Sequence, residues 1–397
     1  MFPDILHPKR LLPALVALFL LAAPLHAGEL ILTPSLAVRE DYNDNIFSQT
    51  SGRRGDFITT LSPGLSASER TEIFNGNLAG GLNSLYYLRT SENDALGYFV
   101  QGAGNYTATP RLSLSANLGY TRDSGASYID PVTLMVTSSR TLHQNYRLGG
   151  RYALTELLNS SFALGYGRDG YDNPAYLDTS HYQGMAGFDY DLGRRFPGIK
   201  LVQALTLNRD ATDLSRVDSV SATLGLSKDL HELWRLSLNA GGRFTHSEFQ
   251  AAGATAWQTH QEWGEVANIS LAYSGERLSG ALALSRDLVA ASGRSGATQT
   301  TGVNLSLSEK FTRHLSGSLG AGYARNWAGK DQYAGQAIDE RSRNLGGSLR
   351  YDFFDAPSDL SLEASYRYNY VEYRLSDTQM AQNIFMLRLN WQHPTFM

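Results

Sequence analysis

The stretch "RLSLSANLGYTRD", residues Arg111–Asp123, alternates strictly between apolar and polar side chains. Its even-numbered residues from Leu112 to Tyr120 are apolar, and its odd-numbered residues from Ser113 to Thr121 are small and mostly polar. Successive side chains of a β-strand point to opposite faces, so this pattern predicts a strand with one apolar and one polar face. The same alternation recurs in "WRLSLNAGGRF" (Trp234–Phe244), "DLSLEASYRYNY" (Asp359–Tyr370) and "NIFMLRLNWQ" (Asn383–Gln392).

Such segments follow one another along the chain. We identify 18, beginning near residues 30, 56, 72, 95, 111, 140, 160, 179, 199, 215, 234, 258, 277, 297, 314, 341, 360 and 380. Short connections such as 109–111 and 274–277 alternate with longer polar ones at 42–55, 123–139, 171–178, 248–257 and 328–340. The pattern predicts an all-β fold, a transmembrane antiparallel β-barrel of about 18 strands (alternatives 16 or 20), with both termini periplasmic. A barrel of this size leaves an aqueous channel unless loops fill it.

A secreted soluble β-protein is the alternative fold. Propellers, sandwiches and β-helices bury their apolar faces, and blades or coils repeat with a fixed length. Here no fixed-length repeat is found, and the polar parity carries mainly Ser, Gly, Asn and Thr. An apolar face toward lipid around a wet interior fits this pattern better.

The N-terminus has the pattern of a secretory signal. Lys9 and Arg10 precede the apolar run Leu11–Ala23, and "PLHAGE" follows. A membrane anchor is the alternative, but 13 residues rise only about 20 Å, short of the roughly 30 Å hydrocarbon core. We predict a signal peptide at residues 1–27, cleaved after Ala27, and an outer-membrane β-barrel domain at 28–397 in a Gram-negative bacterium.

Composition excludes several classes of site. The chain has no cysteine, which rules out disulfides, thiolate metal sites and cysteine nucleophiles. Its net charge of −4 gives no reason to expect nucleic acid as a partner. The histidines are scattered, and no HExxH, G-x-S-x-G or phosphate-loop motif is present. His246, Ser247 and Glu248 are consecutive on a predicted strand, so they point to alternate faces and cannot form a triad. We therefore predict no enzyme activity and no cofactor.

An arginine recurs where strands reach the long loops, in "YTRD", "YGRD", "LNRD", "LSRD" and "YARN". Alternation places these arginines on the lipid-facing parity: Arg122, Arg168, Arg209, Arg286 and Arg325. Asp123, Asp169, Asp210 and Asp287 then face the lumen or rim. Arginine costs only about 0–1 kcal/mol at the membrane interface, and its guanidinium pairs well with phosphate. We predict a ring that meets lipopolysaccharide phosphates; ordinary polar strand ends are the alternative.

The lumen-facing parity carries charges of both signs. The same alternation predicts these lumen-lining residues: Arg147, Arg151, Arg235, Arg243, Arg350, Glu363, Arg367 and Arg388. Asp189, Asp191 and Asp352 point inward by the same count. A lumen of mixed sign with arginine in excess would weakly favour anions or acidic sugars through its field.

The segment "DYNDNIF" (Asp41–Phe47) has the spaced oxygen side chains of a calcium loop. An EF-hand-type loop needs Gly at its sixth position and Glu at its twelfth, where this chain has Ile46 and Gly52. Asp41, Asp44 and Asn45 are therefore weak candidates for a rim cation, and turn hydrogen bonds are the main expectation. Downstream, Pro63 cannot donate to a ladder, which predicts a bulge there.

The start of the barrel also resembles a known family. "DYNDNIF", a polar gap and "GDFITTLSPGLSAS" (Gly55–Ser68) are similar to outer-membrane β-barrel porins encoded beside exopolysaccharide and exosortase gene clusters (beta-barrel porin 2-like). The matching residues are Asp44-Asn45-Ile46 and Ser62-Pro63-Gly64. The resemblance implies a channel or export conduit for surface polysaccharide or exopolysaccharide. A structural or adhesive surface protein, with a plugged lumen and partner-binding loops at 123–139 and 328–340, is the alternative.

The expected partners follow from this interpretation. They are outer-membrane lipid and lipopolysaccharide, the barrel-assembly machinery, and polysaccharide or periplasmic export components. The last strand reaches Trp391, and "QHPTFM" follows with Pro394 interrupting it. Either Phe396 or Trp391 is the expected terminal aromatic that the assembly machinery reads.

Overall fold

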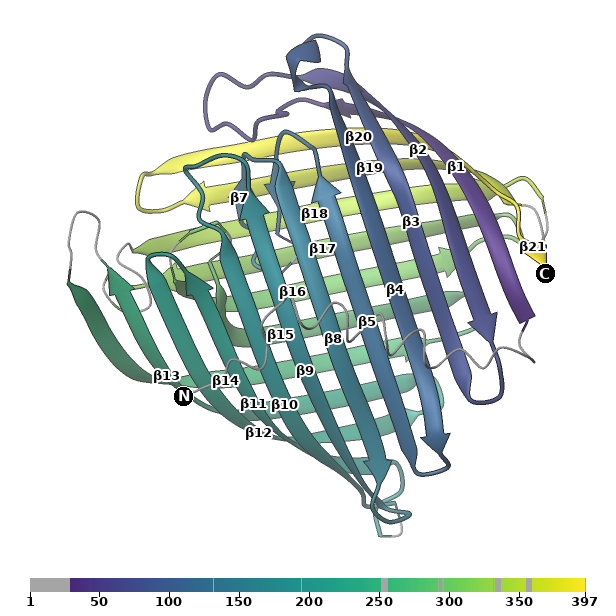
Figure 1. The fold of residues 1–397 in the computed structure, drawn as a ribbon, viewed down its shortest axis with the longest axis vertical. Coiled ribbons are helices and arrows are strands. Elements are labelled where there is room, and N and C mark those ends of the chain that lie inside the picture. Colours follow the sequence, from purple (N-terminus) through teal and green to yellow (C-terminus); the bar gives the residue numbers. More distant parts are fainter. Residues whose placement is uncertain are drawn as a thin grey trace.

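The computed structural model describes residues 29–130, 132–193, 195–250, 256–291, 293–294, 296–330, 332, 337–354 and 359–396. The predicted signal peptide, residues 1–27, lies outside these ranges. The described chain forms a closed antiparallel barrel of 18 strands (Figure 1). These are β1 (Glu29–Asn43), β2 (Asp56–Arg70), β3 (Phe74–Tyr87), β4 (Ala95–Thr109), β5 (Leu112–Asp123), β8 (Thr141–Ala153), β9 (Leu158–Tyr171), β10 (Thr179–Asp191), β11 (Ile199–Thr212), β12 (Ser215–His231), β13 (Trp234–Gln250), β14 (Trp257–Ser274), β15 (Leu278–Ala290), β16 (Ala297–Lys310), β17 (Leu315–Ala328), β18 (Ile338–Asp352), β19 (Asp359–Tyr373) and β20 (Thr378–Gln392).

The barrel closes where its first and last strands meet. In Figure 1 the purple β1 lies beside the yellow β20, and the two pair from Ser35↔Gln392 to Asn43↔Ile384. A short β21 (Thr395–Phe396) follows Pro394 and pairs with Ile31 and Leu32 of β1. Pro394 therefore interrupts the ladder without ending it. Glu29 and Phe396 lie at the same end of the barrel as the short turns.

The smaller elements lie in the loops at the other end. They are a 3-10 turn η2 (Ser91–Asn93) and a hairpin of β6 (Tyr128–Ile129) and β7 (Val136–Thr137). No helix among the described ranges is long and apolar enough to cross a membrane.

The observed strands confirm the fold that the period-two pattern predicted. The predicted strand starts fall within about three residues of those observed. The bulge predicted at Pro63 is wrong. Leu61↔Ser84 and Gly64↔Gly81 keep one register, so the ladder to β3 only skips the two residues between them. A Cβ at Gly81 would lie 2.8 Å from the Pro63 carbonyl oxygen, so glycine allows the strands to stay close without an extra residue.

The two faces of the wall differ in chemistry. Large apolar side chains are exposed on the outer face of most strands, among them Leu61, Leu96, Phe188, Leu224 and Leu389. The opposite parity is polar, as in Ser219 and Ser221 of β12 or Thr298 and Thr300 of β16.

Most neighbouring strands pair along nearly their full length, with at most a short skip or register shift, but one junction is paired over only about half of a strand. β14 and β15 pair only from Ala267↔Arg286 to Ser274↔Ser279, although β14 extends up to Trp257. We call this incomplete junction the β14–β15 seam.

Candidate functional site: a loop across the barrel mouth

Residues 124–140, here called the mouth loop, form a hairpin that turns into the barrel. Its turn is built on Asp130, whose Oδ1 accepts hydrogen bonds from the backbone N–H of Val132 (2.9 Å) and Thr133 (2.7 Å). Leu134 has a φ of 54°, a left-handed conformation that is uncommon for a residue with a side chain. Such a conformation persists only where surrounding contacts hold it in place.

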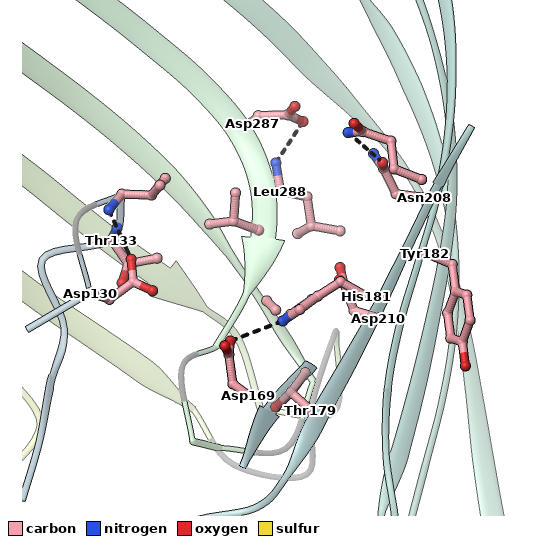
Figure 2. A pocket seen from close by; sticks show the side chains of 14 residues that line it. Asp130, Thr133, Asp169, Thr179, His181, Tyr182, Asn208, Asp210, Asp287 and Leu288 are labelled. Atoms are coloured by element: carbon pink, nitrogen blue, oxygen red, sulfur yellow. Dashed lines mark hydrogen bonds and ion pairs between the residues drawn. The ribbon is translucent and has the colours of Figure 1, made fainter. Parts of the chain in front are cut away.

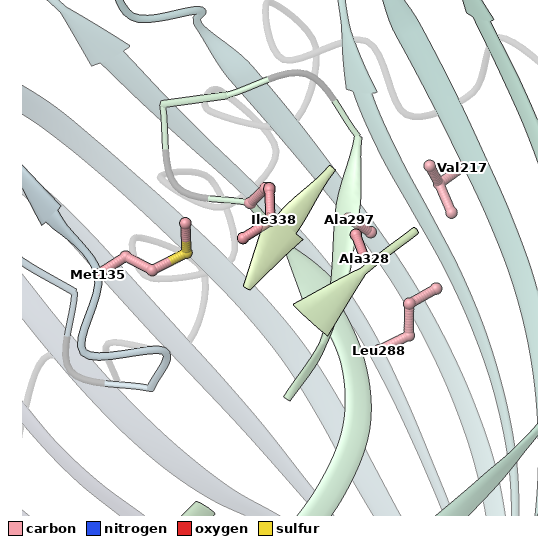
Figure 3. Packing of buried hydrophobic residues seen from close by; sticks show 7 residues of the cluster. Met135, Val217, Leu288, Ala297, Ala328 and Ile338 are labelled. Carbon is pink, nitrogen blue, oxygen red and sulfur yellow. The ribbon is translucent and has the colours of Figure 1, made fainter. Parts of the chain in front are cut away.

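Apolar side chains anchor the mouth loop to the far wall. Met135 is fully buried and lies beside Ile338 of β18, in a cluster that also contains Val217 of β12, Leu288 of β15 and small residues of β16 and β17 (Figure 3). Val136 packs on the other side, against Val371 of β19 and Met380 of β20. Burial of one such side chain contributes roughly 1.5–3 kcal/mol, so these contacts fix the loop on an otherwise polar face.

Hydrogen bonds anchor the mouth loop on further sides. The Thr133 carbonyl accepts from Asn326 Nδ2 of β17 at 2.6 Å. The Ser138 hydroxyl donates to the Phe47 carbonyl at 2.7 Å, and its N–H donates to the Tyr176 hydroxyl at 2.9 Å. Because these partners and the apolar ones come from strands and loops around the barrel, the mouth loop lies across the opening.

A chain of histidines and aspartates lies on the inner wall beneath the loop. His143 Nδ1 is 2.7 Å from Asp169, His181 Nε2 is 3.2 Å from the same carboxylate, and His181 Nδ1 is 2.7 Å from Asp210. The chain therefore crosses β8, β9, β10 and β11. Tyr128 of the mouth loop covers it, with its ring centre 4.4 Å from that of His143. Burial raises the pKa of Tyr128, so its phenol stays neutral.

A cavity of about 270 Å³ separates the mouth loop from this wall (Figure 2). Asp130 and Thr133 line it from the loop, and Asp169, His181 and Asp210 line it from the wall. A second cavity of about 410 Å³ lies lower, on the inner face near the barrel closure. It brings Arg39, Arg350 and Arg388 together with Glu363 and Asp359. The acidic and histidine groups thus gather near the mouth, and three arginines gather nearer the turn end.

The predicted lumen residues all lie on the polar parity of their strands: Arg147, Arg151, Arg235, Arg243, Arg350, Glu363, Arg367 and Arg388. The structure brings only some of them together. Glu363 pairs directly with Arg388 and with Arg350 in the ladders, and Arg350 Nη2 lies 2.7 Å from Asp359. Arg151 bonds Asp189 across β9, and Arg235 bonds Asp229. That they line a water path stays a proposal.

The five predicted interface arginines lie on the outer parity, and each has a carboxylate partner. Arg122 pairs with Asp172, Arg168 with Asp178 (3.1 Å), Arg209 with Asp218 (2.5 Å), Arg286 with Glu265 (2.9 Å) and Arg325 with Asp339 (3.7 Å). Phosphate contact by this ring stays a proposal.

The weak metal candidates are used in barrel closure. Asp44 accepts hydrogen bonds from the backbone N–H and the side-chain amide of Asn383, and Asn45 Nδ2 donates to the Ala381 carbonyl. Asp41 is paired with Arg39 at 2.8 Å. In the part of the chain that the structure describes, no group of three or more His, Asp or Glu side chains is arranged to hold a metal ion.

The inward course of the mouth loop and the histidine–aspartate chain were not predicted from the sequence. A signal for the first was present, because "VTLMV" (Val132–Val136) is an apolar run within a long polar loop. His143 and His181 were seen only as scattered, since strand register was needed to place them beside Asp169.

Comparison with known proteins gives structural matches alone. No family model matches the chain, and no curated protein matches it by sequence. OpdK of Pseudomonas aeruginosa, solved with vanillate, is 12% identical with a TM-score of 0.44, over 92% of this chain and 99% of that chain. OccK2 (OpdF) of the same organism is 13% identical with a TM-score of 0.44, over 92% and 98%. OccAB4 of Acinetobacter baumannii is 10% identical with a TM-score of 0.46, over 94% and 100%. The resemblance to porins beside exopolysaccharide gene clusters stays a prediction.

Proposed function

We propose that the chain is an outer-membrane channel whose mouth is closed or narrowed by the mouth loop. The outer face presents leucine, phenylalanine and tryptophan side chains from most strands, an exposed apolar area that water would penalise and a bilayer would accept. The inner face is polar and holds both cavities. The observation that carries the proposal is the mouth loop itself, which is anchored on several sides of this polar interior.

Conductance in planar bilayers tests the proposal. The wild-type barrel is compared with a variant in which residues 125–139 are replaced by a short Gly-Ser linker. Removal of the loop should give larger steady currents, because Met135, Val136 and Thr133 no longer cross the opening. Heat-modifiable migration on gels checks that both barrels are folded. Silence of both folded barrels would contradict the channel.

A structural or adhesive surface protein with a plugged lumen is the second candidate. The buried anchors of the mouth loop favour it, because a permanent plug would be held in this way. A wild-type barrel that stays silent, with current only after loop removal, would support it.

For the cargo, we propose surface polysaccharide moving outward, with the arginines near the barrel closure attracting acidic sugars. Acidic oligosaccharides should interrupt the current of the loop-deleted channel at lower concentrations than neutral ones of equal length. Equal blocking by both would argue against this cargo.

A further inference from the structure

The β14–β15 seam leaves part of the barrel wall unpaired. Among the described residues, Trp257–Val266 of β14, above Ala267, pair with no strand other than β13. Above Arg286, residues Asp287–Ala290 of β15 pair with β16 alone. Lipid cannot satisfy free backbone groups, so an open edge of this kind must lie at or above the membrane interface or be bridged by side chains.

The upper β15–β16 hairpin turns into the lumen. Leu288 has the parity of Leu284 and Arg286, which face outward, yet it is buried against Val217 on the inner face of β12. The Gly293 carbonyl, at the tip of this hairpin, accepts a hydrogen bond from Leu177 in the loop after β9. The outward-parity side of this hairpin therefore packs toward the inner face of β12. The two parts of the wall overlap at the seam and do not pair.

The lower end of the seam lies near the level of the outer membrane interface. Its eight paired rungs, at about 3.3 Å each and tilted by about 40°, raise that point roughly 20 Å above the turn end. The apolar belt of such barrels is about 25 Å tall and ends in an aromatic girdle. Trp263, which is 75% exposed, packs against Phe244 just above that point, with the two tilted rings centred 5.2 Å apart.

Side chains replace the missing backbone bonds. On the inner side, the Arg243 guanidinium is 1% exposed and reaches past β14 to Asp287 (3.1 Å) and to Gln299 Oε1 (2.8 Å). It passes over Gly264, where a Cβ would collide with it. On the outer side, Arg286 pairs with Glu265 at 2.9 Å. Both bridges are polar and can break without breaking the barrel ladder.

We propose that the β14–β15 seam is a lateral portal between the lumen and the outer leaflet, with Arg243 as its latch. Its ligand is an amphiphile that keeps a hydrocarbon tail in the leaflet and passes a polar head group into the lumen. Outside the seam is the exposed Trp263, and at its inner side lie the polar groups of Arg243, Asp287 and Gln299, so the two ends of an amphiphile match the two sides. A partner strand fits less well, because the Glu265–Arg286 pair already bridges the lower end of the free edge.

The test uses the full barrel in phospholipid nanodiscs that contain a phosphatidylethanolamine with a photoreactive diazirine on its head group. After illumination, adducts are mapped by peptide mass spectrometry. We expect adducts on the lumen parity beside the seam, at Asn268 and Ser285, and a several-fold increase in Arg243→Gln. Two variants serve as controls: Arg216→Gln removes an outward arginine of β12, and Gly242→Ala adds a methyl that meets nothing within 4 Å. Both should give the wild-type amount of lumen adducts.

A locked variant separates a portal from general loosening of the barrel. Because the chain has no cysteine, Glu265→Cys and Arg286→Cys can be joined selectively by a short bismaleimide. In the Arg243→Gln background, this bridge should return lumen adducts to the wild-type amount. Adducts confined to outward positions in every variant would overturn the proposal. So would cross-links between two copies through the β14 edge, which would assign the edge to a second barrel.

Discussion

The wall contains two unusual junctions, and they are built in opposite ways. At the β1–β20 closure the backbone pairs continuously, and Asp44, Asn45 and Gln382 add side-chain hydrogen bonds across it. At the β14–β15 seam the upper backbone pairs are missing, and the Arg243 and Arg286 ion pairs bridge the gap. The closure has side-chain hydrogen bonds in addition to its backbone ladder, whereas the seam lacks part of its backbone ladder.

The difference follows from chain connectivity. β14 and β15 are joined by a turn at residues 275–277, so their lower rungs form at little entropic cost and the upper ones can be lost locally. β1 and β20 have no such tether: Asn45 and Ala381 are 336 residues apart. Closing that loop costs more, and both strands are open edges until they meet. The closure therefore needs the extra hydrogen bonds, whereas the seam can exchange hydrogen bonds for a movable latch.

The largest effect is expected at the closure. Asn45 is fully buried and donates to the Gln49 and Ala381 carbonyls, while its Oδ1 accepts from the Gln49 N–H. Asn45→Ala removes all three of these hydrogen bonds at the closure and should lower the free energy of unfolding by about 3 kcal/mol. Urea unfolding of the barrel in lipid vesicles measures it.

Asn75→Ala is the control for that substitution, because Asn75 is an exposed asparagine on β3. It should change stability by less than about 0.5 kcal/mol. Equal losses from the two variants would show that the closure is no more dependent on side chains than the rest of the wall.

A smaller effect is expected at the seam. Gly264→Ala places a methyl group against the Arg243 guanidinium and should cost about 1–2 kcal/mol, because the latch must shift. The same change at Gly242, on the adjacent strand, meets nothing and should be neutral or stabilising by up to about 1 kcal/mol. Parallel urea unfolding curves test the pair, and a stabilised Gly264→Ala variant would contradict the latch geometry.

Whether a feature of these two junctions can be predicted from the sequence depends on how far apart along the chain the interacting residues lie. Alternation placed Arg243 on the inner parity and Arg286 on the outer parity, since parity is a local property of a strand. It could not reveal that Asp287 and Gln299 meet Arg243, because that contact depends on the β15–β16 hairpin leaving the wall. "RDLVA" (Arg286–Ala290) reads as an ordinary strand end whether it pairs with β14 or turns inward.

The part that Asp44 and Asn45 take in the closure was not predicted, for a related reason. The oxygen side chains of Asp44 and Asn45 suggested a cation because their partners, Asn383 and Ala381, lie at the other end of the chain. The position of the mouth loop could be predicted only in part. Its apolar run carries a local signal of burial, but the surfaces that bury it come from seven different strands and from loops beside them, which no local pattern specifies.

Charge selectivity should depend more on the closure than on the turn end of β13. Arg388 lies in the closure ladder opposite Arg39 and lines the lower cavity, so Arg388→Glu should shift the reversal potential of the loop-deleted channel toward cations. Arg235 lies near the turn end, is 66% exposed and is already paired with Asp229, so Arg235→Glu should shift it less. Bi-ionic KCl gradients measure both shifts. If neither variant changes the reversal potential, these arginines do not line a water path.

The smallest effects are expected from the outer arginines, and they separate the seam from the closed wall. Arg168 and Arg286 each pair with one outward carboxylate, but Arg168 lies on a continuous ladder and Arg286 bridges the seam. Exposed ion pairs contribute about 0–1 kcal/mol, so Arg168→Gln should be near neutral, whereas Arg286→Gln should lose a few tenths of a kcal/mol more of the free energy of unfolding.

Replacing all five outer arginines with glutamine tests the proposed lipopolysaccharide contact, because loss of phosphate binding should destabilise the barrel more in lipopolysaccharide-containing bilayers than in phospholipid alone. An equal loss in both bilayers would assign the ring to its carboxylate partners, and would leave Arg286 as the one member whose position in the wall matters.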